Sequence, residues 1–252
     1  MNPTDIKKIL SQSGIKKGDT LMLHGNAGVS ASIISNKKNK LDIIFNEIID
    51  YLGNKGTILI PTFTYNFCDN KNFNIKKTKS QLGLFSETFR LKKNIKRTSH
   101  PIFSFAIYGN KSDYYLNASI KTCFGKNSIF EFLKKDKGKI SCLGCSFYRV
   151  TFIHHIEQSF GVDYRYIKKF KGNILYKNKK KPITTEYFVK NLNQSVHLNL
   201  ELLYKYLKKE KNLFEVDFGR YNLITTQSNF LFNAGIELLK KNKYALIEEK
   251  YL

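Results

Sequence analysis

The sequence predicts an α/β protein with three layers, in which helices cover both faces of a central mixed, mostly parallel sheet. Short apolar runs such as "TLMLH" and "TILIPTFTY" are typical of strands that are buried on both faces. Between them, apolar residues recur at the spacing of amphipathic helices. Strands that alternate with helices in this way favour a parallel sheet with helical cover.

The first 65 residues predict two helices and two strands in alternation. A helix through residues 6–10 ends at Gly14, and the run "TLMLH" follows as a strand. Apolar residues between 41 and 52 have helical spacing, and Gly53 is a stop signal. The second strand starts directly afterwards, and Pro61 marks its end.

The rest of the chain continues the alternation less regularly. Neither an internal repeat nor a linker rich in proline or serine interrupts it, so residues 1–252 are expected to form a single domain. We expect helices at 84–93, 128–135, 151–160, 196–208 and 226–242, strands at 103–109 and 139–145, and a hairpin around 170–185.

Hydropathy and cysteine content bound the class of protein. The sequence has no uninterrupted apolar run of the length that crosses a membrane, and its first residues, "MNPTDIKKILSQSG", lack the apolar core of a signal peptide. We therefore expect a cytoplasmic protein with no membrane partner. Under that condition its four cysteines are expected to be free thiols.

The net charge of +23 raises the possibility of a polyanionic partner. However, only five of the 43 basic residues are arginine, the residue that base recognition favours. The lysines occur in scattered pairs and triplets mixed with asparagine, as on a solvated surface. We expect no specific nucleic-acid partner, although a nucleic-acid-binding protein remains the competing class.

The stretch "TFIHHIEQ" at 151–158 contains the strongest chemical signal. On a helix, His154 and Glu157 share a face, while His155 points about 100° away. A carboxylate beside an imidazole fixes its tautomer and stabilises the imidazolium, which is the arrangement of a general base. The alternative interpretation is that these histidines only pack or cap the start of a helix.

Two other chemistries use the cysteines. Cys142, Cys145, His154 and His155 offer four ligands for zinc, but adjacent histidines diverge on a helix and "KISCLGC" looks like a buried strand. We therefore expect no metal. A nucleophilic cysteine activated by His154 is a further alternative, and Cys123, in an expected loop, is its best candidate.

Five segments, taken in order, resemble the aminoglycoside 3-N-acetyltransferase family, also called antibiotic N-acetyltransferases. The resemblance covers nearly the whole chain, and its strength lies in the collinear order of the segments. They are "KGDTLMLHGNAGVSA" (17–31), "GTILIPTFTY" (56–65), "GLFSETFRLKKNIKRTSHPIFSFAIYG" (83–109), "CFGKNSIFEFL" (123–133) and "DYRYIKKFKG" (163–172).

The resemblance implies a reaction and two catalytic residues. The family motif T-x-x-H-x-x-E falls on Thr151, His154 and Glu157, which makes His154 the general base and Glu157 the carboxylate that orients it. The implied reaction is direct transfer of an acetyl group from acetyl-CoA to a primary amine of a sugar. The CoA cleft is expected at the C-terminal ends of the strands.

The resemblance also implies residues that bind CoA. Backbone N–H groups after the first strand are expected to donate to the thioester oxygen, and the role of His24 stays open. The family's loop here is usually serine-rich, and two family prolines are replaced by Ile129 and Asp163, which puts the geometry of CoA binding in doubt. The expected CoA contacts are His24, Gly25, Asn26, Ala27, Gly28, Val29 and Ser30, together with Arg97 and Ser104.

The charge balance indicates which amine is acetylated. An aminoglycoside is a polycation, and 20 acidic residues against 43 basic ones disfavour its binding. We therefore expect an amino sugar on an anionic carrier, such as a nucleotide-linked sugar of surface-glycan synthesis. An aminoglycoside acceptor, a longer acyl donor and a fold that binds CoA without catalysis remain alternatives. The resemblance leaves a homodimer as an option.

Overall fold

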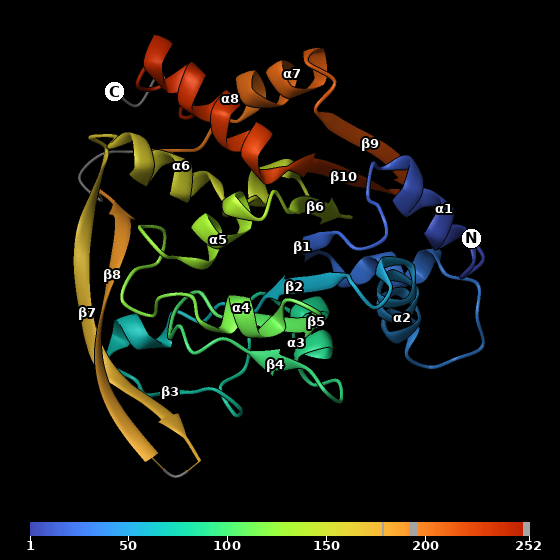
Figure 1. Ribbon diagram of the computed structural model, residues 1–252, viewed down its shortest axis with the longest axis horizontal. Coiled ribbons are helices and arrows are strands. Elements are labelled where there is room, and N and C mark those ends of the chain that lie inside the picture. Colours follow the sequence, from blue (N-terminus) through green and yellow to red (C-terminus); the bar gives the residue numbers. More distant parts are fainter. Residues whose placement is uncertain (178, 192–195, 249–252) are drawn as a thin grey trace.

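The computed structural model describes residues 1–177, 179–191 and 196–248. Its main sheet has seven strands in the order β4-β5-β2-β1-β6-β10-β9 (Figure 1). The strands are β1 (Thr20–Gly25), β2 (Thr57–Pro61), β4 (Lys96–Arg97), β5 (Phe105–Gly109), β6 (Lys139–Leu143), β9 (Leu213–Phe218) and β10 (Tyr221–Gln227).

The strand directions make this a mixed sheet. The central strand β1 pairs in parallel with β2 and β6, whereas the outer pairings with β5, β4, β10 and β9 are antiparallel. Five strands of this sheet therefore run in one direction, and β5 and β10 run against them. A chain that connects two strands with only Gly219 and Arg220 must make them antiparallel, as in β9 and β10.

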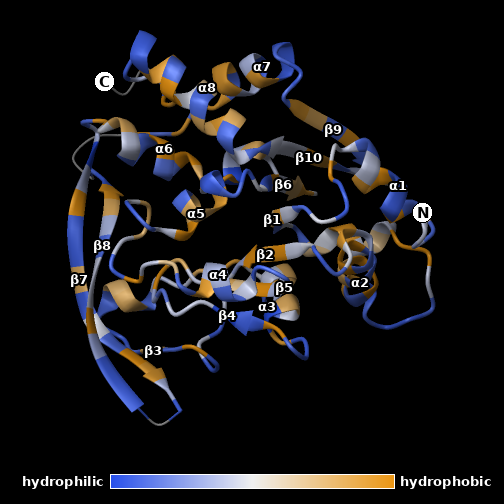
Figure 2. Cartoon of the chain, in the orientation of Figure 1, coloured by the Kyte–Doolittle hydropathy of each residue, from blue (hydrophilic) through white to orange (hydrophobic). Residues whose placement is uncertain are grey.

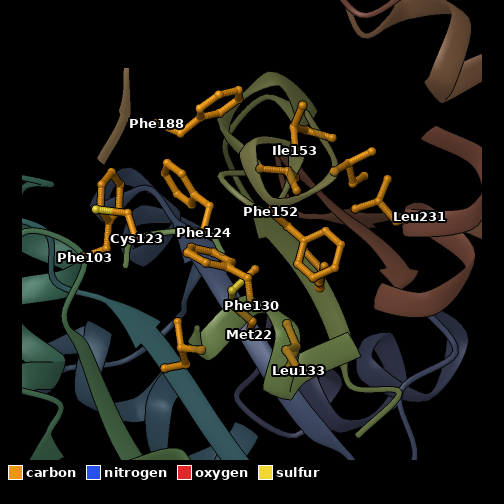
Figure 3. Close-up of a cluster of buried hydrophobic side chains, with 14 of the residues drawn as sticks. Met22, Phe103, Cys123, Phe124, Phe130, Leu133, Phe152, Ile153, Phe188 and Leu231 are labelled. Atoms are coloured by element: carbon orange, nitrogen blue, oxygen red, sulfur yellow. The ribbon is translucent and has the colours of Figure 1, made fainter. Parts of the chain in front are cut away.

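Alternation along the central strands divides the interior into two cores. In β1, Leu21 and Leu23 belong to one buried cluster and Met22 to the other. The first cluster also contains Phe45 of α2. Met22 lies on the opposite face, in the cluster of Figure 3 that includes Phe130 of α5. Side chains of a strand point alternately to its two faces, so helices cover both sides and the three-layer α/β class is confirmed.

The helices are divided between these layers. Those of the first cluster are α1 (Asp5–Gln12), α2 (Lys40–Leu52) and α3 (Leu84–Arg90). The other face is covered by α4 (Ser112–Leu116), α5 (Ile129–Lys135), α6 (Ile153–Phe160), α7 (Glu201–Lys209) and α8 (Ser228–Lys241). Short 3₁₀ turns are η1 (Ala27–Ser32), η2 (Asn66–Asp69) and η3 (Phe147–Arg149).

A long hairpin lies outside the main sheet. Strands β7 (Arg165–Tyr176) and β8 (Lys179–Lys190) pair along their whole length, and β3 (Phe73–Asn74) adds a short parallel edge. Figure 1 shows the hairpin along one side of the molecule, from α6 to β3. Its free end has the hydrophilic colouring of lysines in Figure 2. The hairpin predicted around 170–185 is confirmed and is longer than expected.

The structure also differs from the sequence-based elements in detail. The structure adds a hairpin of β9 and β10 that the sequence pattern does not predict. The edge strand β9 reads "LFEVDF", and this mixture of apolar and acidic residues lacks the continuous apolar run of a buried strand. The final helix starts at Ser228, since residues 226 and 227 belong to β10. None of the helices in the described residues is long and apolar enough to span a membrane.

Candidate active site

A cleft of about 580 Å³ opens at the C-terminal ends of β1, β2 and β6. This volume is within the range of small-molecule sites. Its walls come from the chain just after each of these strands and from the start of α3 and α6. The lining residues are His24, Gly25, Asn26, Ala27, Pro61, Phe63, Tyr65, Gln81, Leu82, Gly83, Leu84, Phe85, Ser86, Cys145, Tyr148, Arg149, Val150, Thr151, His154 and Leu198.

Helix α6 brings the predicted histidine to this cleft. Its apolar side, including Ile153 and Ile156, is buried in the core, and Gly161 ends it with a φ of +84°. Because that side faces the core, the first turn of the helix lies beside the ends of the strands. His154 in this turn lines the cleft. The side chain of His154 is 18% exposed, and the ring of Phe124 packs 5.2 Å from its centroid.

The predicted pair of His154 and Glu157 forms. Nδ1 of His154 lies 2.7 Å from Oε2 of Glu157, one helical turn away. An ionised carboxylate can only accept hydrogen bonds, so Nδ1 carries the proton and Nε2 keeps a free lone pair. No described residue hydrogen-bonds Nε2. The ring nitrogen that can take a proton is thus the one left to a ligand.

Glu157 is held as an anion by a buried network. Its side chain is 0% exposed, Nε of Arg165 lies 2.8 Å from Oε2 as an ion pair, and the Tyr164 hydroxyl donates to Oε1 at 3.1 Å. Burial raises the pKa of Glu157, but the neighbouring His154 and Arg165 side chains and the accepted hydrogen bonds outweigh burial and hold the pKa below its ordinary value. Such a carboxylate orients His154 and stabilises its protonated form.

His155 has a different environment from its neighbour. It is buried, and its Nδ1 donates to the carbonyl oxygen of Phe124 at 2.7 Å. Its ring also packs against Phe152 and Phe232. Burial lowers the pKa of His155 to about 4, so it is neutral. His155 thus ties α6 to the loop before α5.

His24 lies at the end of β1 in the cleft wall. It is 8% exposed, and its Nε2 is buried without a hydrogen-bond partner among the described residues. Burial lowers the pKa of His24 to about 4, which keeps the ring uncharged. The next residue is glycine because Phe85 packs on it: a Cβ on Gly25 would lie 2.4 Å from the ring. That space is therefore occupied by the ring of Phe85.

Only the first part of the loop expected to bind CoA lines the cleft. Asn26 and Ala27 do so, but Gly28, Val29 and Ser30 do not. Val29 is 0% exposed, because it packs in the core, and a Cβ on Gly28 would meet the Tyr221 hydroxyl at 2.6 Å. Of the segment expected to bind CoA, residues 24–27 line this cleft.

Arg97 and Ser104, two further predicted CoA contacts, lie in the interior of the fold. Ser104 is fully buried, and the guanidinium of Arg97 donates to the Ser104 hydroxyl, to Thr62 O at 2.8 Å and to Thr78 O. Neither residue lines the cleft. Arg97 instead joins the chain after β2 to the loop before α3. The family-like position of Arg97 is thus explained by the fold.

The cysteine alternatives find little support in the geometry. Cys123 is 1% exposed, and burial raises its pKa well above the ordinary value, which disfavours the thiolate that a nucleophile needs. Cys142 is buried in β6, and only Cys145 reaches the cleft. Within the described ranges, no three His, Cys, Asp or Glu side chains gather closely enough to hold a metal.

Sequence reasoning missed several cleft residues that follow β6. Tyr148 and Arg149 sit on η3, are exposed, and line the cleft with Thr151. The available signal was the position of "SFYRV" directly after a buried strand, since ligands of α/β sheets bind at strand C-termini. Among Arg, Lys, Asp and Glu, only Arg149 occurs in the described lining.

Comparison with known proteins places this chain in a family of N-acetyltransferases. The model of the aminoglycoside 3-N-acetyltransferase family matches residues 29–240. The chain therefore belongs to that family, which confirms the resemblance. Among curated proteins, it is 25% identical over 175 residues to the SPβ prophage-derived aminoglycoside N(3')-acetyltransferase-like protein YokD of Bacillus subtilis strain 168. That match covers 60% of this chain and 63% of the relative, less than two thirds of its length.

Solved structures share the fold over almost the whole chain. The aminoglycoside acetyltransferase AAC(3)-Xa superposes with a TM-score of 0.82 at 16% identity, covering 96% of this chain and 93% of the other. The AAC-IIIb binary complex with CoASH gives a TM-score of 0.81 at 17% identity, covering 96% and 97%. At these identities the similarity establishes the fold.

Proposed function

We propose that this protein is an acetyl-CoA-dependent N-acetyltransferase that acetylates a primary amine of an amino sugar. The observation that carries this proposal is the hydrogen bond between His154 and the buried Glu157 at the edge of a cleft. Family membership supports the same reaction class. The arrangement provides a base where the strand ends would present two substrates side by side.

His154 removes the proton from the acceptor. A sugar amine at neutral pH is mostly ammonium, and it must lose a proton before or during its attack on a thioester. Nε2 of His154 has the free lone pair for this step, and the anionic Glu157 stabilises the imidazolium that results. Arg165 and Tyr164 keep that carboxylate in place and act as positioning residues.

The cleft also offers groups suited to the acyl donor. The backbone N–H of Ala27, the first residue of η1, has no acceptor among the described residues and faces the developing charge of a thioester oxygen in this proposal. The exposed guanidinium of Arg149 is suited to a phosphate of CoA. The amine nitrogen bonds to the acetyl carbon, the C–S bond of the thioester breaks, and CoA leaves as a thiol with the proton that His154 had taken up, so no covalent intermediate on the protein is needed.

The acceptor in this proposal is an amino sugar on an anionic carrier, such as a nucleotide-linked sugar. The described lining of the cleft contains no Asp or Glu, and the whole chain has a net charge of +23. A polycationic aminoglycoside would lose Coulomb energy in such a site. The second candidate acceptor is nevertheless an aminoglycoside, because the family model and AAC(3)-Xa are named for that activity.

Thiol release from acetyl-CoA in the presence of an amine panel tests both parts of the proposal. We expect turnover with nucleotide-linked amino sugars to exceed turnover with kanamycin-type amines, and the reverse order would select the aminoglycoside alternative. A protein that binds CoA without turnover of any amine would be a non-catalytic member of the family. Tight, salt-dependent retention on nucleic acid together with indifference to His154→Ala would support the nucleic-acid-binding alternative.

A further inference from the structure

A second cleft, of about 700 Å³, lies on the other side of the loop that carries Phe124. Its walls are the loop at 119–126, the C-terminal half of α6 and the hairpin of β7 and β8, which pass close to each other in Figure 1. We call it the lysine cleft. Its lining residues are Ser119, Ile120, Lys121, Thr122, Gly125, Lys126, Gln158, Lys169, Lys181, Pro182, Ile183, Thr184 and Glu186.

Backbone hydrogen bonds fix the walls of the lysine cleft. Glu186 of β8 donates its N–H to the carbonyl of Lys121 at 2.8 Å and accepts from the N–H of Cys123 at 2.9 Å. The Thr122 hydroxyl accepts from the N–H of Gly125 at 3.0 Å, which shapes the turn of the loop. The loop thus joins the hairpin as an additional strand-like edge, so its shape is part of the fold.

The charge of this cleft is strongly one-sided. Four lysines, Lys121, Lys126, Lys169 and Lys181, face a single carboxylate, Glu186. Lys169 lies 3.8 Å from that carboxylate, and the other three form no ion pair with any described residue. Several ammonium groups around one concave surface repel each other and attract an anion, and lysine is a good point charge for phosphate.

The wall of α6 adds a polar group that lacks a partner. The side-chain oxygen of Gln158 is buried and has no hydrogen-bond donor within the described part of the chain. Gly125 makes room for this amide, since a Cβ there would lie 2.9 Å from its nitrogen. A buried acceptor without a donor is costly, and a hydroxyl of a ligand would satisfy it.

Helix α6 connects the lysine cleft to the candidate active site. Gln158 follows His154 by four residues, which is about 6 Å along a helix axis. Phe124 is buried between the two sites: its ring packs against His154, and the loop that carries it lines the lysine cleft through its neighbours.

We infer that the lysine cleft binds the diphosphate of a nucleotide-linked amino sugar. This inference rests on the proposed function, and it names the group that carries the anionic charge of the acceptor. Diphosphate also occurs in CoA, so the two sources share one chemistry and must be separated by experiment. The acceptor is favoured because the groups assigned to CoA, Ala27 and Arg149, line the other cleft.

The test compares two double variants with the same change in net charge. Lys121→Ala/Lys126→Ala removes two ammonium groups of the lysine cleft, and Lys8→Ala/Lys17→Ala removes two exposed ones outside both clefts. Titration with inorganic diphosphate, followed by calorimetry, measures binding without any turnover. We expect the dissociation constant to rise about tenfold in the first variant and less than twofold in the second.

Kinetics then separate the two sources of diphosphate. We expect the first variant to raise the KM for a uridine-diphosphate amino sugar about tenfold and to leave the KM for acetyl-CoA within twofold. A rise in the KM for acetyl-CoA alone would overturn the assignment to the acceptor. Equal diphosphate affinity in the two double variants would overturn the site itself, even in an active enzyme. Diphosphate binding that depends on Lys121 and Lys126 would support the site even if no amine were acetylated, which keeps it distinct from the proposed function.

Discussion

The two clefts on either side of Phe124 use charge in opposite ways. In the cleft of His154, the key carboxylate is fully buried, its charge is balanced by Arg165, and the Tyr164 hydroxyl donates a hydrogen bond to it. In the lysine cleft, the charges are exposed, and Lys169 and Glu186 are 66% and 43% accessible. The first site is preorganised for a proton transfer, where a fixed geometry is worth most. In the second site, most of the positive charge has no counter-charge, as expected of a surface that attracts an anionic ligand.

The largest expected effect comes from His154→Ala. Removing the base is expected to lower kcat by about 10² to 10⁴, the usual contribution of a general base, while CoA binding remains. Thiol release and calorimetry with CoA measure the two quantities separately. A variant that kept wild-type turnover would show that this cleft is not the catalytic one, and the contrast between the two clefts would lose its basis.

Glu157→Gln tests the contrast between the buried carboxylate of Glu157 and the exposed carboxylate of Glu186 through the free energy of unfolding. The amide keeps an acceptor for Nδ1 of His154 but leaves the buried Arg165 without its counter-charge, so we expect the free energy of unfolding to fall by about 3 kcal/mol and kcat to fall as well. The matched change in the lysine cleft, Glu186→Gln, removes an exposed pair and should cost less than about 1 kcal/mol. Urea denaturation of both variants measures the difference, and equal costs would contradict the described burial of Glu157.

The dependence of stability on pH is a third test of the same contrast. Burial lowers the pKa of His24 from 6.5 to about 4, so below pH 6.5 the unfolded chain binds a proton that the folded protein does not. This contribution is therefore complete above pH 6.5 and is lost as the pH falls toward 4, by about 2 kcal/mol at pH 5. We expect His24→Gln to reduce the loss of stability between pH 7 and pH 5 by that amount.

The control for this experiment is Lys121→Ala, whose lysine stays charged over the whole range. Thermal or urea unfolding at the two pH values should show the same loss of stability as in the wild type. A His24→Gln variant with an unchanged pH dependence would show that His24 is not buried in an uncharged form.

The smallest effect is expected from Arg149→Ala. An exposed guanidinium that meets a phosphate is expected to change the KM for acetyl-CoA by about three- to tenfold, and Arg149→Lys should recover part of it. The KM for the amino sugar should stay near the wild-type value, which is the opposite of the lysine-cleft variant. Initial rates measured over a grid of both substrate concentrations give the two KM values. If only the KM for the amino sugar changed in Arg149→Ala, the roles assigned to the two clefts would have to be exchanged.

Local patterns predicted much of the fold and the central pair of the site. The periodicity around 151–160 was enough to place His154 and Glu157 on one helical face, because that relation depends only on residues one turn apart. The positions of the buried strands along the chain likewise follow from apolar runs. The hairpin β9–β10 was missed, since an edge strand need not be apolar on either face.

Sequence alone thus determined the α/β class and the alignment of a histidine with a carboxylate, because both depend on short-range periodicity. Tertiary structure decided which charges are compensated. Arg97 resembles a ligand-binding arginine in the sequence but is enclosed by backbone carbonyls, and Arg165 reaches Glu157 only because β7 returns beside α6. Lysines from a loop and from two hairpin strands likewise gather only after folding. Electrostatic roles are set by distance and burial, which neighbours in sequence do not reveal.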